Sequence, residues 1–595
     1  MRSVPSAATA ALILASATAL LCQNTPPDKA GGPAQILTAD DVRAVLTVAA
    51  TALNDDTLAA AVVDRTGNIV GVYARPGTDE RSPDVAVSLA RTGAMFANDQ
   101  APLSSRTVRF ISGIHFPPGV KNTPNAALYG VENINRGCRV DVQGDAVFNA
   151  PFPRPKSIAG VFGDGTAGST PLACEPSDTR GCARGGPMLD DNGDSLPAVG
   201  ITTGKADVFD TGQTSLGAVP VNPGGIPIYR GGKVIGGVGV AGVRPDLAEY
   251  AATLAAAGSG RGMDFSEPLG TPGAVLIDGL RLPFFGTCTN IPCIRQALRT
   301  RPAGSSPGQV SGGTFLIQPR DGLQAPENYV LGPRASAVPG GLTQDEVQRI
   351  IDQSVAVALR TRAMIRLPIN QPARMTISIS DETGTILALY RMPDGTVFSS
   401  DVAMTKARNA YYFSTREGYE VLRDTTATSA HDRYTWSPDP PAGRGWAITA
   451  RTISFAGQPL FPPGIDLDEQ LEAQDSQPQH GPWFDLYVYD TKNACTEGPG
   501  PSRGGNRAFL NQSGIVWFPG SVPLYRGDTV IGGLGVSGDG VEQDDYVSEL
   551  GSDGFHPPDS LRVDNSVMTD AKGRQVRLPY LKLPRNPEIQ TSSPR

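Results

Sequence analysis

The chain has 595 residues, of which 69 are Gly and 52 are Pro, with 18% charged residues and a formal net charge of −8. This length exceeds what one hydrophobic core supports, and the mild acidity argues against nucleic acid as a partner, because nucleic-acid-binding proteins present a basic face. The high glycine and proline content predicts compact domains joined by long, turn-rich loops.

The first 22 residues are typical of an export signal. Arg2 supplies the positive start, and the apolar run Ala7–Leu21 is short for a membrane-spanning helix. Cys22 follows at once, as in a lipoprotein signal, although Leu21 stands where a small residue is usual. Lipidation of Cys22 and ordinary cleavage near Ala19 therefore both stay open. We expect an exported protein of the periplasm or cell surface, with 23–36 as a flexible tether and lipid as its only membrane contact.

The cysteines agree with export. Without Cys22 an even set remains, namely Cys138, Cys174, Cys182, Cys288, Cys293 and Cys495. An oxidising compartment makes disulfides the expected state of such a set. Pairs 288/293 and 174/182 would close short loops, leaving 138 and 495 to join the two halves, but the connectivity stays open. Neither zinc-finger spacing nor a haem-attachment motif is present.

An internal repeat is the strongest signal in the sequence. Residues 37–42 (LTADDV) match 342–347 (LTQDEV), and residues 226–231 (IPIYRG) match 522–527 (VPLYRG). Between and beyond these blocks, further collinear matches join 63–67 to 380–384, 84–86 to 401–403, 90–91 to 407–408, 106–108 to 451–453, 116–119 to 461–464 and 281–284 to 577–580. The chain therefore contains two diverged copies of one domain, each with a C-terminal extension.

Each copy predicts the same elements in the same order. Thr38 and Thr343 begin a helix with an apolar face, and a hairpin with a central glycine follows at 58–73 and 376–390. Helices are expected at 84–96 and 401–413, followed by long inserts. A late hairpin turns at 230–232 and 526–528, and a last helix runs at 246–255 and 542–550. Pro227 and Pro523 place their strands at a sheet edge, because proline has no N–H to donate.

This order predicts the α/β (α+β) class, with an antiparallel sheet and packed helices in each copy. We expect a first domain at 37–287, a linker at 288–341, a second domain at 342–585 and a tail at 586–595. The copies should pack as a pseudo-two-fold pair, because each would otherwise expose an apolar helical face. The extensions Val275–Phe285 and Val576–Leu581 should be ordered and strand-like.

The second copy resembles the GlcG/HbpS-like family. The resemblance rests on Asp401-Val402-Ala403, Lys406-Ala407-Arg408-Asn409-Ala410, Gly535-Val536-Ser537-Gly538 and Glu542-Gln543-Asp544. It implies a profilin-like fold, self-association through helices, and small-molecule binding, with haem bound by some members and catalysis demonstrated for few. The first copy departs from the pattern, since Leu89 replaces the lysine, Ala241 replaces the serine, and Gln543 has no counterpart.

We therefore expect an exported, non-catalytic small-molecule or cofactor-binding protein, with haem as the leading ligand and copy two as the better binder. The candidate ligand contacts are His115, His431, Arg408, Lys406, Ser537 and Gln543. The two histidines are candidate axial ligands, and aromatic residues near His431 could line a flat cofactor. Two alternatives stay open, namely an assembly scaffold without a ligand and an enzyme acting on a small organic acid.

Other patterns favour structural roles. Gly-x-Gly-x-x-Gly occurs at 237–242 and 533–538, but each follows a hairpin strand, so tight helix packing is favoured over a dinucleotide site. The histidines lack zinc-ligand spacing. The acidic residues Asp539, Glu542, Asp544 and Asp545 could bind a cation, but a solvated helix start is the favoured interpretation. The repeated arginines at 91 and 408, and at 106 and 451, either bind loop carbonyls or form an anion clamp.

Overall fold

A computed structural model describes residues 36–78, 82–113, 222–258, 275–277, 280–319, 321–424, 434–457, 481–483, 486, 514–570, 573 and 575–590. The expected export signal, Cys22 and most of the tether lie outside these residues, as do Cys138, Cys174, Cys182 and Cys495. Within the described part, no helix combines the length and apolar character needed to cross a membrane.

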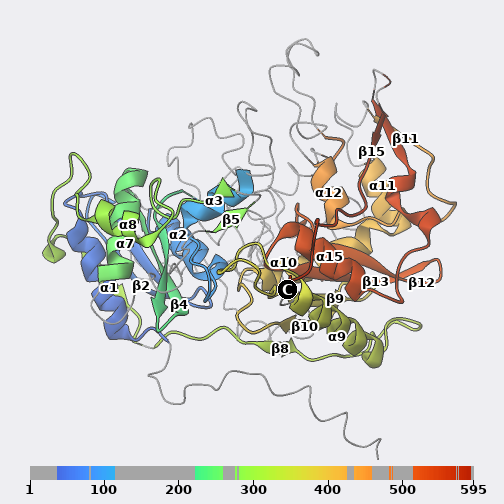
Figure 1. Cartoon of the computed structure of the whole chain (residues 1–595), viewed down its shortest axis with the longest axis horizontal. Helices are drawn as coiled ribbons and strands as arrows, with labels where there is room; N and C mark the ends of the chain where they lie inside the picture. Colours follow the sequence, from blue (N-terminus) through green and yellow to red (C-terminus); the bar gives the residue numbers. More distant parts are fainter. Residues whose placement is uncertain are drawn as a thin grey trace, which may run out of the picture. The chain divides into compact units, whose positions relative to one another are not determined.

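Each repeat forms an antiparallel sheet with packed helices (Figure 1), and the two five-stranded sheets have the same strand order. The first sheet runs β3-β4-β1-β2-β7, and the second runs β12-β13-β9-β10-β8. The strands of the first are β1 (Ala59–Asp64), β2 (Ile69–Ala74), β3 (Gly225–Arg230), β4 (Lys233–Ala241) and β7 (Thr314–Ile317). Those of the second are β8 (Asn328–Leu331), β9 (Thr376–Ser380), β10 (Ile386–Arg391), β12 (Ser521–Arg526) and β13 (Thr529–Ser537). The expected class, antiparallel sheets with packed helices, is confirmed.

Helices cover both faces of each sheet. In the first repeat, α1 (Ala39–Ala52) and α7 (Pro245–Gly258) lie side by side on one face, and α2 (Ser82–Phe96) packs on the other. The second repeat uses α9 (Gln344–Arg360) and α15 (Val541–Gly551) on one face and α10 (Ser399–Phe413) on the other.

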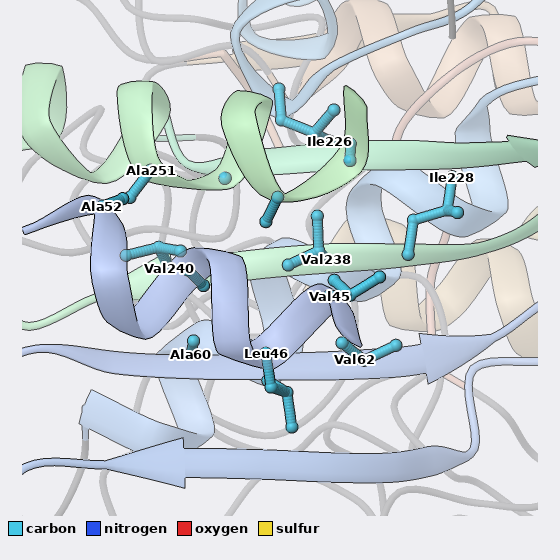
Figure 2. Close-up of a cluster of buried hydrophobic side chains, with 14 of the residues drawn as sticks. Val45, Leu46, Ala52, Ala60, Val62, Ile226, Ile228, Val238, Val240 and Ala251 are labelled. Atoms are coloured by element: carbon cyan, nitrogen blue, oxygen red, sulfur yellow. The ribbon is translucent and has the colours of Figure 1, made fainter. Parts of the chain in front are cut away.

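Figure 2 shows the core under α1 and α7. Val45 and Leu46 of α1 pack with Ala60 and Val62 of β1, and all four side chains are fully buried. The alternate residues of β1, including Val63, belong to a second core under α2. This alternation is the period of two that a strand imposes, and it explains why the five residues Ala59–Val63 of β1 are all apolar.

The sequence signals for helix starts and edge strands are confirmed. Thr38 and Thr343 both form capping boxes, with Asp41 and Glu346 as the returning carboxylates. Pro227 and Pro523 lie in β3 and β12, which are edge strands.

The repeated glycines bring the second helix of each repeat onto its sheet. A Cβ on Gly239 would lie 1.9 Å from the carbonyl oxygen of Ala86, and a Cβ on Gly535 would lie 2.0 Å from that of Ala403. These helix carbonyls occupy the space that a side chain would need. The geometry therefore supports the packing interpretation of the Gly-x-Gly-x-x-Gly pattern.

Residues 288–341, expected as a linker, contribute structure to both repeats. They contain α8 (Ile291–Leu298), the short turn η1 (Val310–Gly312), and the strands β7 and β8. Strand β7 pairs with β2 and strand β8 pairs with β10, so this segment supplies one edge strand to each sheet. Cys288 and Cys293 form a disulfide just before and inside α8.

The extensions are held by the same contacts in both repeats. Thr107 at the start of α3 (Ser105–Gly113) donates its hydroxyl to Pro283 O at 2.9 Å, and Thr452 in α12 (Ala450–Ala456) donates to Pro579 O at 2.8 Å. The first extension forms the two-stranded sheet of β5 (Leu276–Ile277) and β6 (Leu280–Arg281). The second extension begins within β15 (Gln575–Arg577), an edge strand of a three-stranded sheet whose other strands are β14 (Val567–Asp570) and β11 (Tyr434–Ser437). The short turns η4 (Asp559–Leu561) and η5 (Val563–Asn565) precede β14 in the chain.

The repeats also contact each other. The rings of Phe96 and Phe398 stack with centroids 4.1 Å apart, and Asn98 Nδ2 donates to Ile365 O at 3.1 Å. The core under α2 includes side chains from the second repeat, such as Val402. The pseudo-two-fold relationship between the copies stays a prediction.

Candidate functional site

A buried ion pair distinguishes the second repeat from the first. Lys406 on α10 and Asp544 on α15 are both buried, with Nζ 3.0 Å from Oδ2. Lys406 Nζ also donates to Val536 O at 2.8 Å and lies 4.4 Å from the ring centroid of Phe518. The remaining oxygen of the aspartate, Oδ1, has no partner among the described residues.

The first repeat fills the same position with apolar groups. Leu89 takes the place of Lys406, and Ala248 takes the place of Asp544. A Cβ on Gly224 would lie 3.3 Å from both the Leu89 and the Ala248 side chains, whereas one on Gly520 would lie 2.7 Å from Lys406 Nζ and 2.5 Å from Asp544 Cβ. The same position between helix and sheet is thus filled by Leu89 and Ala248 in the first repeat and by an ion pair in the second.

Burial sets the protonation behaviour of this pair. Removal from water raises the pKa of Asp544 to about 7, against the opposing charge of Lys406. The same desolvation lowers the pKa of Lys406. A carboxylate with a pKa near neutrality can accept a proton at physiological pH, but this one is enclosed and already bonded.

The interpretation of residues 539–545 as a solvated helix start is wrong. Asp539, Asp544 and Asp545 are all buried, and each pairs with a cation that lies far away in the sequence. Arg366 pairs with Asp539, and Arg451 Nε lies 2.7 Å from Asp545 Oδ2. Desolvation raises the pKa of Asp539 and of Asp545.

The repeated arginines are engaged within the fold. Arg91 Nε donates to Gly67 O at 2.9 Å, and Arg408 Nε donates to Gly384 O at 2.7 Å, so both bind the carbonyl at a hairpin turn. Arg106 pairs with Glu249 at 2.6 Å, as Arg451 does with Asp545. These contacts match the loop-holding interpretation, and the anion clamp is not needed to explain the arginines.

The structure separates the other predicted ligand contacts. His115 and His431 lie outside the described residues. Ser537 ends β13 with its hydroxyl buried and without a partner in the described part of the chain. Gln543 is buried on α15, against Gly540. His556, an exposed histidine, has Nε2 2.9 Å from Glu549 O.

The sequence pointed to aromatic residues near His431, but the larger aromatic cluster that Tyr434 and Trp436 join in the second repeat was missed. All four tryptophans of the chain lie between 436 and 517. Their rings join a core that also contains Tyr412, Phe413, Tyr419, Tyr434, Tyr525 and Tyr580. The clustering of tryptophan in one insert was a signal for this core, but the contacts between its distant parts were not visible in the sequence.

Trp436 is a partly exposed ring of this aromatic cluster. It stacks on Trp483 with centroids 5.8 Å apart, and Tyr419 meets it at an interplanar angle of 85°. Arg416 and Arg423, on α11 (Arg416–Asp424), lie within 6 Å of the Tyr419 ring centre. A half-buried aromatic ring beside cations can stack a flat ligand and attract its negative groups.

The described residues contain no group of three or more His, Cys, Asp and Glu side chains placed to hold a metal ion. The arrangement therefore offers aromatic faces, hydroxyls and cations to a ligand.

Comparison with known proteins places an HbpS-like segment in the second repeat. The family model described as haem degrading protein HbpS-like matches residues 483–552. A crystal structure of a PduOC–heme complex is 18% identical, with 36% of this chain and 93% of that chain covered and a TM-score of 0.19. Klebsiella pneumoniae protein ORFY, of the family model DUF336, is 17% identical, with coverages of 34% and 86% and a TM-score of 0.16. No curated protein matches the chain. The family match thus covers part of the second repeat, in agreement with the resemblance expected from its motifs.

Proposed function

We propose that this chain acts after export as a non-catalytic small-molecule-binding protein, and that its second repeat binds a flat ligand, with haem as the leading candidate. The observation that carries the proposal is Trp436, a partly exposed ring at the edge of the aromatic cluster. A ligand that stacks there would contact a platform already held in place by Trp483 and Tyr419.

The described residues suit part of a haem. The ring of Trp436 can stack on the macrocycle, and Arg416, whose 38% exposed side chain pairs with Glu420 at 2.8 Å, can exchange this surface partner for a carboxylate of the ligand. Histidine is a usual axial ligand of haem iron, and His431 precedes β11 by a short stretch outside the described residues. His431, which lies outside the described residues, would be the residue that binds the haem iron, and the family name of the matched segment supports this ligand class.

The first repeat has no tryptophan, and it replaces Lys406 and Ser537 by Leu89 and Ala241. It offers fewer polar and aromatic groups for orienting a ligand, so the second repeat should be the binder. The first repeat then serves as the packing partner.

The test is a titration of the full chain with haemin, followed by the Soret band and by tryptophan fluorescence. Because all four tryptophans belong to the aromatic cluster, the fluorescence comes from that cluster, but haem quenches at long range, so the variants locate the ligand. Trp436→Leu should weaken binding about tenfold, the scale of one lost aromatic contact. Tyr329→Leu removes another exposed ring of the same repeat, on β8, and should bind like the parent chain.

Equal affinities of the Trp436→Leu variant and the parent would place the ligand elsewhere. If the parent shows no saturable binding, the assembly scaffold becomes the better account. A changed titration in the Tyr329→Leu control would show that loss of any exposed ring disturbs the repeat.

A further inference from the structure

A row of buried hydroxyls faces α10 in the second repeat. Thr376, Ser378 and Ser380 alternate along β9 with Ile377 and Ile379, which belong to the core under α9 and α15. Since side chains alternate between the faces of a strand, the three hydroxyls point to the opposite face, which α10 covers. The first repeat has Ala59, Ala61 and Val63 at these positions, all in its apolar core under α2.

These hydroxyls meet further polar groups at the start of α10. Ser537 of β13 lies directly opposite Thr376 in the sheet, and Gly535 lies opposite Ser378. A Cβ on Gly533 would meet Ala407 of α10, and a Cβ on Gly535 would meet Ala403. A step of two residues along β13 therefore corresponds to a step of four residues along α10, toward the N-terminus of the helix. The same step brings Ser537 level with Ser399 and Ser400.

The first repeat supports this register. Gly242 follows Ala241, the counterpart of Ser537, and a Cβ on Gly242 would lie 3.4 Å from Ser82 Oγ. Ser82 is the counterpart of Ser399 at the start of the helix.

Four hydroxyls at this corner are fully buried and have no partner among the residues that the structure describes: Thr376, Ser378, Ser400 and Ser537. A buried hydroxyl without a partner costs about 1–3 kcal/mol, and native structures leave few of them. Four at one corner therefore point to a missing partner rather than to chance.

The partner's charge follows from the helix. α10 is 15 residues long, and its first residue is preceded by Phe398, which makes no side-chain cap. The positive end of the helix dipole favours an anion at this end, where Ser400 N donates to Val397 O at 3.2 Å and Ser399 Oγ lies 2.6 Å from Thr396 Oγ1. Nearby Asp539 is ion-paired with Arg366 through Oδ2, its buried Oδ1 has no partner among the described residues, and Asp401 of the first turn has an interaction of its own.

We infer that the corner formed by Thr376, Ser400 and Ser537 at the N-terminus of α10 binds a small oxyanion, a carboxylate or a phosphate group. This site is separate from the aromatic cluster and does not depend on the proposed flat ligand. It gives a role to Ser537, which the family-like motif contains and whose hydroxyl has no partner among the described residues.

The experiment is calorimetric titration of the full chain with sodium acetate and with sodium phosphate, at an ionic strength held constant with sodium chloride. The parent chain should show saturable binding of at least one anion. Acetate alone would assign a carboxylate site, and phosphate alone a phosphate site. The triple variant Thr376→Ala/Ser400→Ala/Ser537→Ala should bind at least about tenfold more weakly, since each lost hydrogen bond to a charged group contributes about that factor.

Ser354→Ala is the matched control. Ser354 is also fully buried with an unpartnered hydroxyl, but it lies on α9, on the opposite side of the sheet, so its loss should leave anion affinity unchanged. If the triple variant does not fold, the anion affinity of the single variant Ser537→Ala is measured instead. Alanine should be tolerated there, because the first repeat has alanine at the same position.

No saturable heat with either anion, or equal affinity in the parent and the alanine variants, would overturn the inference. Trp436→Leu should retain anion binding, so a failure of the flat-ligand proposal and a failure of this one give different results.

Discussion

Lys406 Nζ lies 3.0 Å from Asp544 Oδ2, and both side chains are buried, whereas Leu89 and Ala248 occupy the same positions in the first repeat. Both members of the pair differ between the repeats, which is the pattern expected when two side chains depend on each other. One charge without the other would be left buried and uncompensated.

We predict that Lys406→Leu and Asp544→Ala each lower the free energy of unfolding by about 3–5 kcal/mol, because each leaves one buried charge alone. The double variant, which recreates the contact of the first repeat, should recover most of this loss. Urea denaturation of the parent, both single variants and the double variant measures the coupling.

Simple addition of the two single losses in the double variant would contradict this dependence. The matched control is Arg562→Leu with Asp564→Ala, an ion pair of the same repeat whose side chains are about one-third exposed. Its coupling should stay below about 1 kcal/mol.

The pKa of Asp544 predicts a pH dependence. Its folded value of about 7 lies above the ordinary value of 3.8, so the folded state holds a proton that the unfolded state releases. The contribution of Asp544 to the free energy of unfolding is therefore fully present below about pH 4 and is lost as the pH rises toward 7. The difference in unfolding free energy between the parent and the Lys406→Leu/Asp544→Ala variant should shift against the parent across this range. Denaturation curves between pH 4 and 7 test it, and a difference that stays constant would refute the raised pKa.

The fold was largely predictable because the repeat carries local signals. Thr38 and Thr343, the glycine at each hairpin turn, and Pro227 and Pro523 act through neighbouring backbone, so a sequence pattern is enough to find them. Strands β7 and β8 were missed because each is four residues long and gains its place only by pairing with a strand far away in the sequence.

Packing of the glycine pattern gives a third prediction. Gly535→Ala would set a Cβ 2.0 Å from the Ala403 carbonyl oxygen, so α10 would have to move away from the sheet. We expect a loss of about 1–3 kcal/mol or more in the free energy of unfolding. Gly332→Ala is the control, because it has open space around its Cβ and is exposed. A neutral Gly535→Ala variant would show that the helix does not depend on this close approach.

The contacts of the second extension give a fourth prediction. Arg451 pairs with Asp545, and Asp545 Oδ2 also accepts the N–H of Lys582 at 3.1 Å. Arg451→Met should leave the buried Asp545 carboxylate without its cation, so that residues after 575 become accessible to limited proteolysis. Mass spectrometry of the fragments would detect the cleavage. Arg106→Met should act likewise on the first extension, because Glu249 accepts the N–H of Gly286 at 3.0 Å. Unchanged cleavage rates in both variants would show that the ion pairs do not hold the extensions.

The candidate site was less predictable than the fold. The acidic residues near 544 looked solvated because their cations, Lys406 and Arg451, lie far away in the sequence. The platform of Trp436, Trp483 and Tyr419 likewise joins three separate segments, and only the folded chain brings the rings together. Side chains that depend on such distant contacts cannot be assigned from spacing alone.

Native mass spectrometry of the full chain, purified without denaturation after export, tests the central claim most directly. The account predicts a bound small molecule whose added mass equals that of haem or another flat cofactor, and which is depleted in Trp436→Leu but retained in Tyr329→Leu. A spectrum with only the polypeptide mass, from a chain that also fails to take up added haemin, would contradict it.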